Sequence, residues 1–455
     1  MQNSKKQAEN IKSQYQSQHQ SVHPSVNTAN IQNKNAGSQH QSLNSNVQSN
    51  KQSIQQGISQ KSSINDPNKP SKSKLMKKSS LRVSRNKSPP QITKSLDGKT
   101  KISDNSGNDY YVANNDEKDE EEIKKSINKK YKDILKESMT QEVKPPEKPI
   151  GDGFRSFTQL TKAGKNQNGQ QKTNQDIPLI HVNTGSISRF NLFAVLDGHG
   201  PQGHFVSQFC RTYFIKKMTD YANFCKQKNL TTSEAIYNEL KQTKFAYIVD
   251  IFNKADIELA NQKQNFDCNF SGTTCNLAIQ LNKHLICASV GDSRGIMIED
   301  KGDKKNLGIV QLSTDQKPDL PEEMKRIISK GGAVDKITDY NGEKVGPPRV
   351  WKAGTNYPGL AMSRSLGDFQ AKQCGVVPTP QIVEYTINKN TRYLVICSDG
   401  VWEFIQNEQV RDLGNIYFNK NNVGGFCTEL IKFAIYSWEQ FDIIRDDITV
   451  VCVYF

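Results

Sequence analysis

Short blocks of hydrophobic residues recur over the last two thirds of the chain, and they predict strands separated by helices. Residues 178–182 and 190–196 are apolar or alternating, and the turn between them favours a β-hairpin. Other short, β-branched runs are typical of strands that are buried on both faces. The predicted strands are residues 151–160, 178–182, 190–196, 273–281, 284–290, 295–299, 308–313, 393–396 and 448–455.

Apolar residues at helical spacing predict helices between these strands. Phe205, Phe209 and Tyr213 lie four residues apart and define one such face. The predicted helices are residues 201–221, 233–261, 321–331 and 425–439. Residues 335–358 are polar and glycine-rich, so we expect an irregular loop there. Hairpin-linked strands and helices that occur in blocks favour an α+β fold in which helices cover antiparallel sheets.

The N-terminal third lacks this periodicity. It is rich in Gln, Asn, Ser and Lys and poor in large apolar residues, so it cannot bury enough surface to offset its ordering entropy. We expect residues 1–149 to form a disordered basic tail and residues 150–455 to form one folded domain. The acidic run at 116–122, followed by two lysines, is compatible with one short charged helix. Deletion of residues 1–140 is therefore expected to leave catalysis intact.

The formal net charge of +14 resides mostly in the tail and is densest at residues 72–87. This segment could serve as a nuclear-import signal, a contact for an acidic surface or a cluster of kinase sites, but its composition favours a solvated basic linker. Because the charge lies in the tail, we expect no nucleic-acid binding by the folded part.

All nine cysteines lie from Cys210 onward, and no CxxC pair occurs. We interpret them as buried thiols in a reducing compartment. The N-terminus has no apolar signal core, Gln2 is not the glycine of a myristoylation site, and no run reaches the length of a membrane span. We expect a monomer in the cytoplasm, the nucleus or both, with no membrane partner.

Four aspartates at the ends of apolar runs suggest the chemistry. Asp197, Asp292 and Asp399 follow such runs, and Asp446 precedes one. A carboxylate at the tip of a buried strand costs free energy unless a cation meets it. Several tips that converge would form a site for hard divalent cations, which prefer oxygen ligands. The residues alone therefore predict a metal-dependent enzyme.

The motifs around these aspartates, taken in order, resemble the metal-dependent protein serine/threonine phosphatases of the PP2C (protein phosphatase 2C, PPM) type. The resemblance spans about residues 150–455. It depends on Asn174–Asp176, Asp197–Gly200, Ser271–Thr274, Gly291–Arg294, Asp315–Pro318, Gly331–Gly332, Ser363–Asp368, Ser398–Glu403 and Asp446–Val450. It implies a four-layer α-β-β-α sandwich with two central antiparallel sheets, and phosphorylated proteins as partners.

The resemblance also implies a centre of two Mn²⁺ or Mg²⁺ ions and a third, weaker site. Asp197 would bridge the two metal ions, and the carbonyl of Gly198 would bind one of them. A hydroxide between the ions would attack phosphorus directly. The remaining implied metal ligands are Asp399 and Asp446 for the first ion, Asp176 for the second, and Asp292 with Asp399 for the third.

Two further residues have implied catalytic roles. His199 would protonate the departing seryl or threonyl oxygen. Lys172, four residues before Asp176, would hold phosphate as a point charge. The early motif here is Gln175-Asp176, so it lacks a second-metal glutamate, and Gln316 stands where the family often has histidine.

Plainer interpretations compete with several of these roles. Asp292 could pair with Arg294, His199 could only orient water, and Lys172 could be a surface lysine. Asp368 and Arg364 favour an ion-pair or capping role, and Asp447 is expected to face solvent. For the whole chain, the alternatives are a catalytically weak pseudophosphatase that acts as a binding scaffold, and a hydrolase of another phosphoester such as a nuclease.

Overall fold

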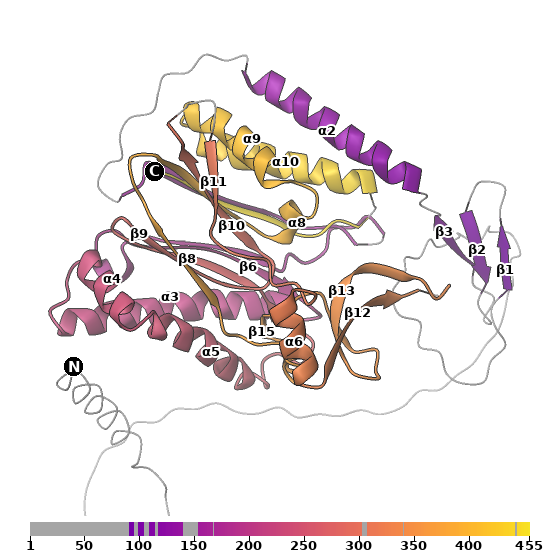
Figure 1. Ribbon diagram of the computed structural model, residues 1–455, viewed down its shortest axis with the longest axis horizontal. Helices are drawn as coiled ribbons and strands as arrows, with labels where there is room; N and C mark the ends of the chain where they lie inside the picture. Colours follow the sequence, from indigo (N-terminus) through magenta and orange to yellow (C-terminus); the bar gives the residue numbers. More distant parts are fainter. Residues whose placement is uncertain are drawn as a thin grey trace, which may run out of the picture. The chain divides into compact units, whose positions relative to one another are not determined.

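Two antiparallel sheets lie face to face at the centre of the fold (Figure 1). The computed structural model describes residues 91–94, 99–103, 109–113, 117–139, 153–166, 168–302, 307–339, 341–441 and 444–455. In strand order, the first sheet consists of β15 (Leu366–Gly367), β7 (Gly272–Thr273), β6 (Phe190–His199), β8 (Cys275–Leu281), β9 (His284–Val290) and β16 (Gln381–Thr386), with β5 (Asp176–His181) paired to β6.

The second sheet has five strands and includes the C-terminal strand. Its order is β11 (Leu307–Gln311), β10 (Arg294–Asp300), β17 (Thr391–Cys397), β18 (Ile448–Tyr454) and β4 (Ser156–Lys162). Every strand pair in both sheets is antiparallel. The predicted hairpin of residues 178–182 and 190–196 is confirmed by β5 and β6.

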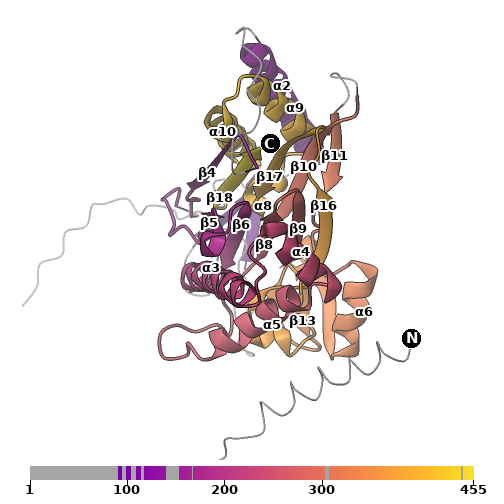
Figure 2. The ribbon, with the colours of Figure 1, turned by 90° about the vertical axis from the view of Figure 1, so that its left-hand side faces the viewer.

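Helices cover the outer face of each sheet, which confirms the predicted four-layer sandwich (Figures 1 and 2). The first sheet carries α3 (Gly203–Gln227), α4 (Ser233–Gln242) and α5 (Ala246–Ala260). The second carries α8 (Asp399–Trp402), α9 (Asn407–Asn419) and α10 (Val423–Phe441). Three shorter helices, η1 (Thr184–Ser186), α6 (Pro321–Ser329) and α7 (Phe369–Lys372), lie in the connections between strands.

The alternation along β6 shows how the sequence specifies these layers. Leu192, Ala194 and Leu196 pack under the helices, whereas Phe193 and Val195 pack between the sheets. All five side chains are fully buried. Because a strand has a period of two, a one-residue slip would exchange these faces, so the hydrophobic pattern fixes the register. The same period places Asp197, two residues after Val195, on the face of β6 that points between the sheets.

Two predicted elements are wrong. The helix predicted over 233–261 is interrupted, since Lys244 and Phe245 both have left-handed φ angles, of 51° and 60°. The loop predicted over 335–358 is largely a three-stranded sheet of β12 (Gly332–Thr338), β13 (Lys344–Lys352) and β14 (Pro358–Leu360). Most side chains of β12 and β13 are exposed or half-buried, so they leave no apolar stripe to predict strands.

The prediction of a disordered tail over residues 1–149 does not hold for the helix α2 (Glu117–Met139), which packs against α9 and α10. The strands β1 (Gln91–Lys94), β2 (Lys99–Ser103) and β3 (Asp109–Ala113) also lie in this segment and pair as one antiparallel sheet. The rest of the predicted tail, apart from these elements, lies outside the described residues. The charged helix expected at residues 116–122 is thus longer than predicted.

All nine cysteines are buried and free, as the sequence predicted. In the part of the chain that the structure describes, no helix has both the length and the apolar character needed to cross a bilayer.

Candidate metal centre

The aspartates singled out in the sequence meet at one end of the sandwich, although they come from distant segments. Asp176 and Asp197 lie opposite each other in the register of β5 and β6. Asp399 is the first residue of α8 and lies two residues after the end of β17, and Asp292 lies two residues after the end of β9. Asp446 lies two residues before β18. The ends of both sheets therefore deliver carboxylates to a common region.

The electrostatic environment of these carboxylates indicates that they influence one another. Burial raises the pKa of Asp197 well above its ordinary value, and four nearby carboxylates raise it further: Asp176, Asp399, Asp446 and Asp292. Asp399 shows the same pattern, with burial first, then Asp446 and Asp292, against a smaller opposing effect of Lys317. Burial also raises the pKa of Asp176 to about 7. The site therefore concentrates negative charge that the chain itself does not fully compensate.

Three of these carboxylates have a buried oxygen without a hydrogen-bond partner: Oδ1 of Asp176, Asp292 and Asp399. The other oxygen of Asp176 accepts a hydrogen bond from Ser398 Oγ at 2.7 Å. Buried polar atoms are almost always satisfied, so an unpartnered group is typical of a site that binds an ion or water. Among the described residues, no three His, Cys, Asp or Glu side chains form a compact ligand cluster. A metal shell here would therefore include backbone carbonyls and water.

The backbone around Gly198 leaves no room for a side chain. A Cβ atom at this position would lie 2.5 Å from the Gly203 carbonyl oxygen and 2.6 Å from the Gln175 carbonyl oxygen. At Gly200, where φ is +82°, a Cβ would lie 2.0 Å from the Phe270 carbonyl oxygen. The segment Asp197–Gly200 thus packs backbone against backbone, which only glycine permits.

Two lysines form ion pairs with aspartates of the candidate metal centre. Lys172 Nζ lies 2.5 Å from Asp446 Oδ1 and 3.3 Å from Asp447 Oδ2. Lys317 Nζ lies 2.5 Å from Asp292 Oδ2. Burial lowers the pKa of both ammonium groups, but the adjoining carboxylates more than offset this and raise it. Lys317 lies in the motif Asp315–Pro318, but no role was predicted for it from the sequence.

His199 is held by a carboxylate that the sequence placed only in a structural role. Its Nε2 lies 2.7 Å from Asp368 Oδ2, and its Nδ1 is buried without a hydrogen-bond partner. Burial lowers the pKa of His199, but Asp368 outweighs this and raises it. The expected ion-pair role of Asp368 is therefore confirmed, with His199 as the partner.

Asp447 does not face solvent, so that expectation is wrong. Its side chain is 2 % exposed and accepts hydrogen bonds from the backbone N–H groups of Gly164 (2.7 Å) and Gln175 (2.9 Å). Val453 and Val451 point between the sheets, and the same alternation brings Asp447 inward. This period of two was the signal that could have identified it.

The suggested pairing of Asp292 with Arg294 is also wrong. Arg294 forms a two-pronged ion pair with Asp315, with N···O distances of 3.0 and 2.7 Å. Asp292 instead pairs with Lys317. Gln316 is buried, and its Oε1 accepts a hydrogen bond from the Gly291 N–H at 2.6 Å. This contact fixes the turn that carries Asp292.

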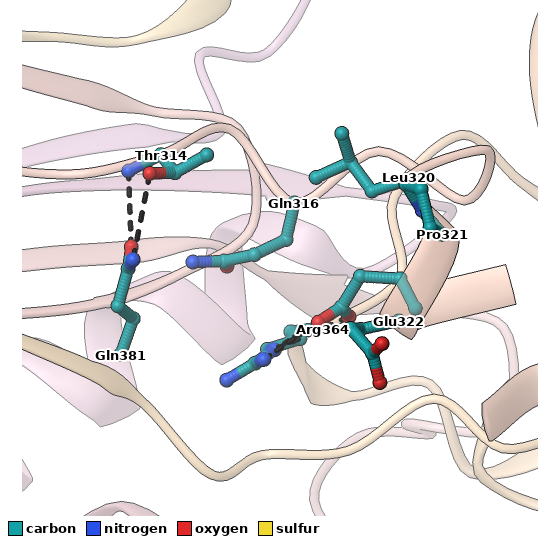
Figure 3. A pocket seen from close by; sticks show the side chains of 8 residues that line it. Thr314, Gln316, Leu320, Pro321, Glu322, Arg364 and Gln381 are labelled. Carbon is teal, nitrogen blue, oxygen red and sulfur yellow. Dashed lines mark hydrogen bonds and ion pairs between the residues drawn. The ribbon is translucent and has the colours of Figure 1, made fainter. Parts of the chain in front are cut away.

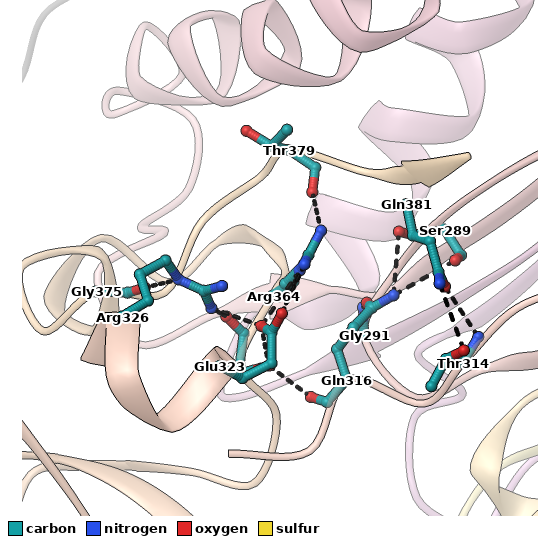
Figure 4. A network of polar contacts seen from close by, with 11 residues as sticks. Ser289, Gly291, Thr314, Gln316, Glu323, Arg326, Arg364, Gly375, Thr379 and Gln381 are labelled. Atoms are coloured by element: carbon teal, nitrogen blue, oxygen red, sulfur yellow. Dashed lines mark hydrogen bonds and ion pairs between the residues drawn. The ribbon is translucent and has the colours of Figure 1, made fainter. Parts of the chain in front are cut away.

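Glu323 on α6 is also a buried carboxylate, but it differs from the acids at the candidate metal centre (Figure 4). Arg364 Nη2 and Arg326 Nη2 each lie 2.6 Å from it, and Ser363 Oγ donates a third hydrogen bond at 2.6 Å. Burial raises the pKa of Glu323, but these partners outweigh it and lower the pKa to about 2. Arg364 thus has the predicted ion-pair role.

A pocket of about 300 Å³ lies beside this ion pair (Figure 3). Its lining includes Gln316, Arg364 and Gln381, and Gln381 Oε1 accepts a hydrogen bond from the Thr314 N–H at 3.0 Å. Because Glu323 neutralises Arg364, the pocket does not offer this guanidinium as an unpaired cation for phosphate.

Comparison with known proteins agrees with this architecture. The family model described as protein phosphatase 2C matches residues 153–438. Over 287 residues the chain is 31% identical to "Probable protein phosphatase 2C 61" of Arabidopsis thaliana, a match that covers 63% of this chain and 81% of that protein. A second relative, "Probable protein phosphatase 2C 12" of Oryza sativa subsp. japonica, is 30% identical over 322 residues and is covered to 79%, with 63% of this chain covered.

A solved structure shares the fold. The chain is similar to the crystal structure of a serine-threonine phosphatase 2C from Toxoplasma gondii, with a TM-score of 0.52 and 19% sequence identity. The match covers 69% of this chain and 98% of that one.

Proposed function

Because the chain belongs to the protein phosphatase 2C family, we propose that it is an active protein serine/threonine phosphatase with a divalent metal centre at the end of the sandwich. The observation that carries this proposal is the uncompensated carboxylate cluster around Asp197. The family resemblance implies a metal centre formed by these residues, and their concentrated negative charge supports the binding of a cation.

The residues present fit divalent ions. Carboxylate oxygens are ligands that Mn²⁺ and Mg²⁺ prefer, and three such oxygens are buried here without a partner. Asp197, the Gly198 carbonyl, Asp399 and Asp446 would hold one ion, Asp197 and Asp176 a second, and Asp292 with Asp399 a weaker third. When bound, such ions neutralise phosphate charge and make water a stronger nucleophile.

His199 and Asp368 form the proton-transfer pair of this proposal. Asp368 fixes the imidazole through Nε2 and favours its protonated form. We assign to the protonated imidazole of His199 the role of donating a proton to the departing seryl or threonyl oxygen. Asp368 acts through His199 and is a positioning residue.

Lys172 supplies a positive charge at the rim. Its ammonium group contacts Asp446 and Asp447, so it lies beside the proposed ligands. An ammonium group holds phosphate as a point charge, without the planar fork of arginine. We propose that Lys172 binds a phosphate oxygen of the substrate, while Asp446 would serve as a ligand of the metal.

The test is turnover of a phosphothreonine peptide by the full chain, with and without Mn²⁺. We expect phosphate release only with the metal, loss after chelation and recovery on adding Mn²⁺ back. Peptide binding by a folded protein with no turnover at saturating Mn²⁺ would instead favour the binding scaffold.

A further inference from the structure

The helix α10 is apolar around most of its circumference and needs cover on two sides. One side packs on β4 and β18 of the second sheet. Phe426, Leu430 and Phe433 are buried along its length. A helix that is hydrophobic on all sides is stable in water only when it is enclosed. The cover on the outer side comes from α2.

The helix α2 has the pattern needed for this contact. Ile123, Ile127, Tyr131 and Ile134 follow one another at spacings of four and three, which places them on one face. Ile127 and Ile134 are only 6% and 5% exposed and belong to the same hydrophobic cluster as α9 and α10. Figure 1 shows α2 alongside these two helices.

Specific polar contacts fix the position of α2. The Tyr131 ring stacks on Phe433 with centroids 5.8 Å apart, and its hydroxyl donates to Asp412 Oδ2 on α9 at 3.0 Å. Lys420 Nζ donates to the Ser138 carbonyl at 2.7 Å. These contacts lie at the middle and at the end of α2, so they fix its orientation. Apolar packing alone would not do so.

This helix lies outside the residues that match the phosphatase 2C family model, because the match begins at residue 153. The catalytic unit of this chain thus has an extra helical layer built from a segment that precedes the matched region. The family match does not account for this contact.

The last two turns of α10 connect α2 to the candidate metal centre. On one side, Ser126 Oγ of α2 shares a hydrogen bond with Tyr436 Oη at 2.9 Å. On another, Trp438 Nε1 donates to the carbonyl of Gly400, which follows Asp399, at 2.8 Å. Glu439 in the same turn lies 3.8 Å from Arg445, which precedes Asp446.

We propose that α2 is an intramolecular ligand of the α9–α10 surface, and that its docking holds the segments carrying Asp399 and Asp446 in place for the metal. The second half of this proposal rests on the proposed function. Release of α2 loosens the last two turns of α10 and so lowers the affinity for Mn²⁺. The chain therefore carries a control element for its own metal centre.

The test compares two neighbouring positions of α2 in the full chain. Ile127→Asp places a carboxylate in the buried contact, and Asn128→Asp places the same group on the exposed side. Hydrogen exchange of residues 117–139 reports docking, and calorimetry with Mn²⁺ reports metal affinity. We expect Ile127→Asp to speed exchange of α2 by about 100-fold and to weaken Mn²⁺ binding by about 3- to 10-fold. Asn128→Asp should change neither.

Several outcomes would overturn the proposal. Unprotected amides in α2 of the unmodified chain would refute docking. Faster exchange in Ile127→Asp with unchanged Mn²⁺ affinity would refute the link to the metal centre. If Ile127→Asp fails to fold, Ile127→Ala and Ser126→Ala replace it with the same readouts. A wild-type chain that binds no Mn²⁺ would refute the proposed function, while the exchange data would still decide whether α2 docks.

Discussion

Two groups of buried carboxylates in this chain differ in how their charge is balanced. Glu323 has two arginines and a serine hydroxyl at 2.6 Å each, and its pKa falls to about 2. Asp197 is surrounded mainly by other carboxylates, and its pKa rises well above the ordinary value. Both groups are desolvated, so the difference comes from their neighbours and not from burial alone.

A buried carboxylate with cationic partners has a structural role, whereas one without enough such partners favours the binding of a cationic ligand. A buried ion pair that is fully hydrogen-bonded fixes local structure, and Glu323 joins α6 to the segment that contains Arg364. An uncompensated cluster destabilises the chain unless a cation binds. The contrast predicts opposite consequences when the charge is removed from each group.

The largest effect is expected at the metal centre. Asp399→Asn removes a proposed ligand that is worth several kcal/mol of charge stabilisation, so turnover of a phosphopeptide should fall by about 10³-fold. Without metal, the same variant should be more stable by on the order of 1 kcal/mol, because one repelling charge is gone. Kinetics at saturating Mn²⁺ and denaturant melts of the metal-free protein measure the two effects. Asp319→Asn, at an exposed carboxylate, is the control, and retained turnover in Asp399→Asn would contradict the assignment.

The next effect concerns the proton-transfer pair. His199→Ala should slow hydrolysis of a phosphothreonine peptide by about 10²-fold. Hydrolysis of p-nitrophenyl phosphate should slow far less, because its leaving group needs no proton. Adding Asp368→Asn to His199→Ala should cost nothing further, since Asp368 acts only through His199. Equal losses on both substrates would exclude the proton-donor role, and His204→Ala serves as the control.

Removing the charge of Glu323 should destabilise the protein, whereas Asp399→Asn should stabilise the metal-free protein. The pKa of Glu323 is lowered from an ordinary value near 4.5 to about 2. The ionised carboxylate therefore stabilises the folded state fully above about pH 4.5, and this stabilisation is lost as the pH falls toward 2. Glu323→Gln should therefore reduce the free energy of unfolding at pH 7 by roughly 3 kcal/mol. The difference from the unmodified chain should vanish near pH 2.

Denaturant melts between pH 2 and pH 7 test this prediction. Glu322→Gln is the matched control, because Glu322 is the exposed neighbour on the same helix. The Mn²⁺ dependence of any turnover should be unchanged in Glu323→Gln. A loss of stability that does not depend on pH would mean that packing, not the ion pair, accounts for the effect.

The sequence predicted the layers because burial imposes a clear period on buried strands, as in residues 192–196. It could not predict the ribbon of β12 and β13, whose largely polar, exposed side chains carry no such period. The break between α4 and α5 lies at Lys244 and Phe245. It could not be predicted, because neither residue is a glycine or a proline. The packing of α2 depends on α9 and α10, which follow it by hundreds of residues.

The sequence predicted the aspartates of the candidate site better than it predicted the residues that contact them. The aspartates of the family motifs do converge, as the burial and charge around Asp197 indicate. Lys317 was missed, the environment of Asp447 was predicted wrongly, and the ion-pair role of Asp368 was predicted without its partner His199, since these contacts form only through tertiary structure. A motif therefore locates the ligands of a site, whereas the groups that tune them depend on how distant segments pack.

The most direct test of the uncompensated cluster is a crystal of the full chain soaked in Mn²⁺ and measured at the manganese absorption edge. We predict anomalous peaks within bonding distance of Asp197 and Asp399, and none at Glu323. Absence of any peak beside Asp197 would contradict the account, because the carboxylates gathered there would then have no cation to bind.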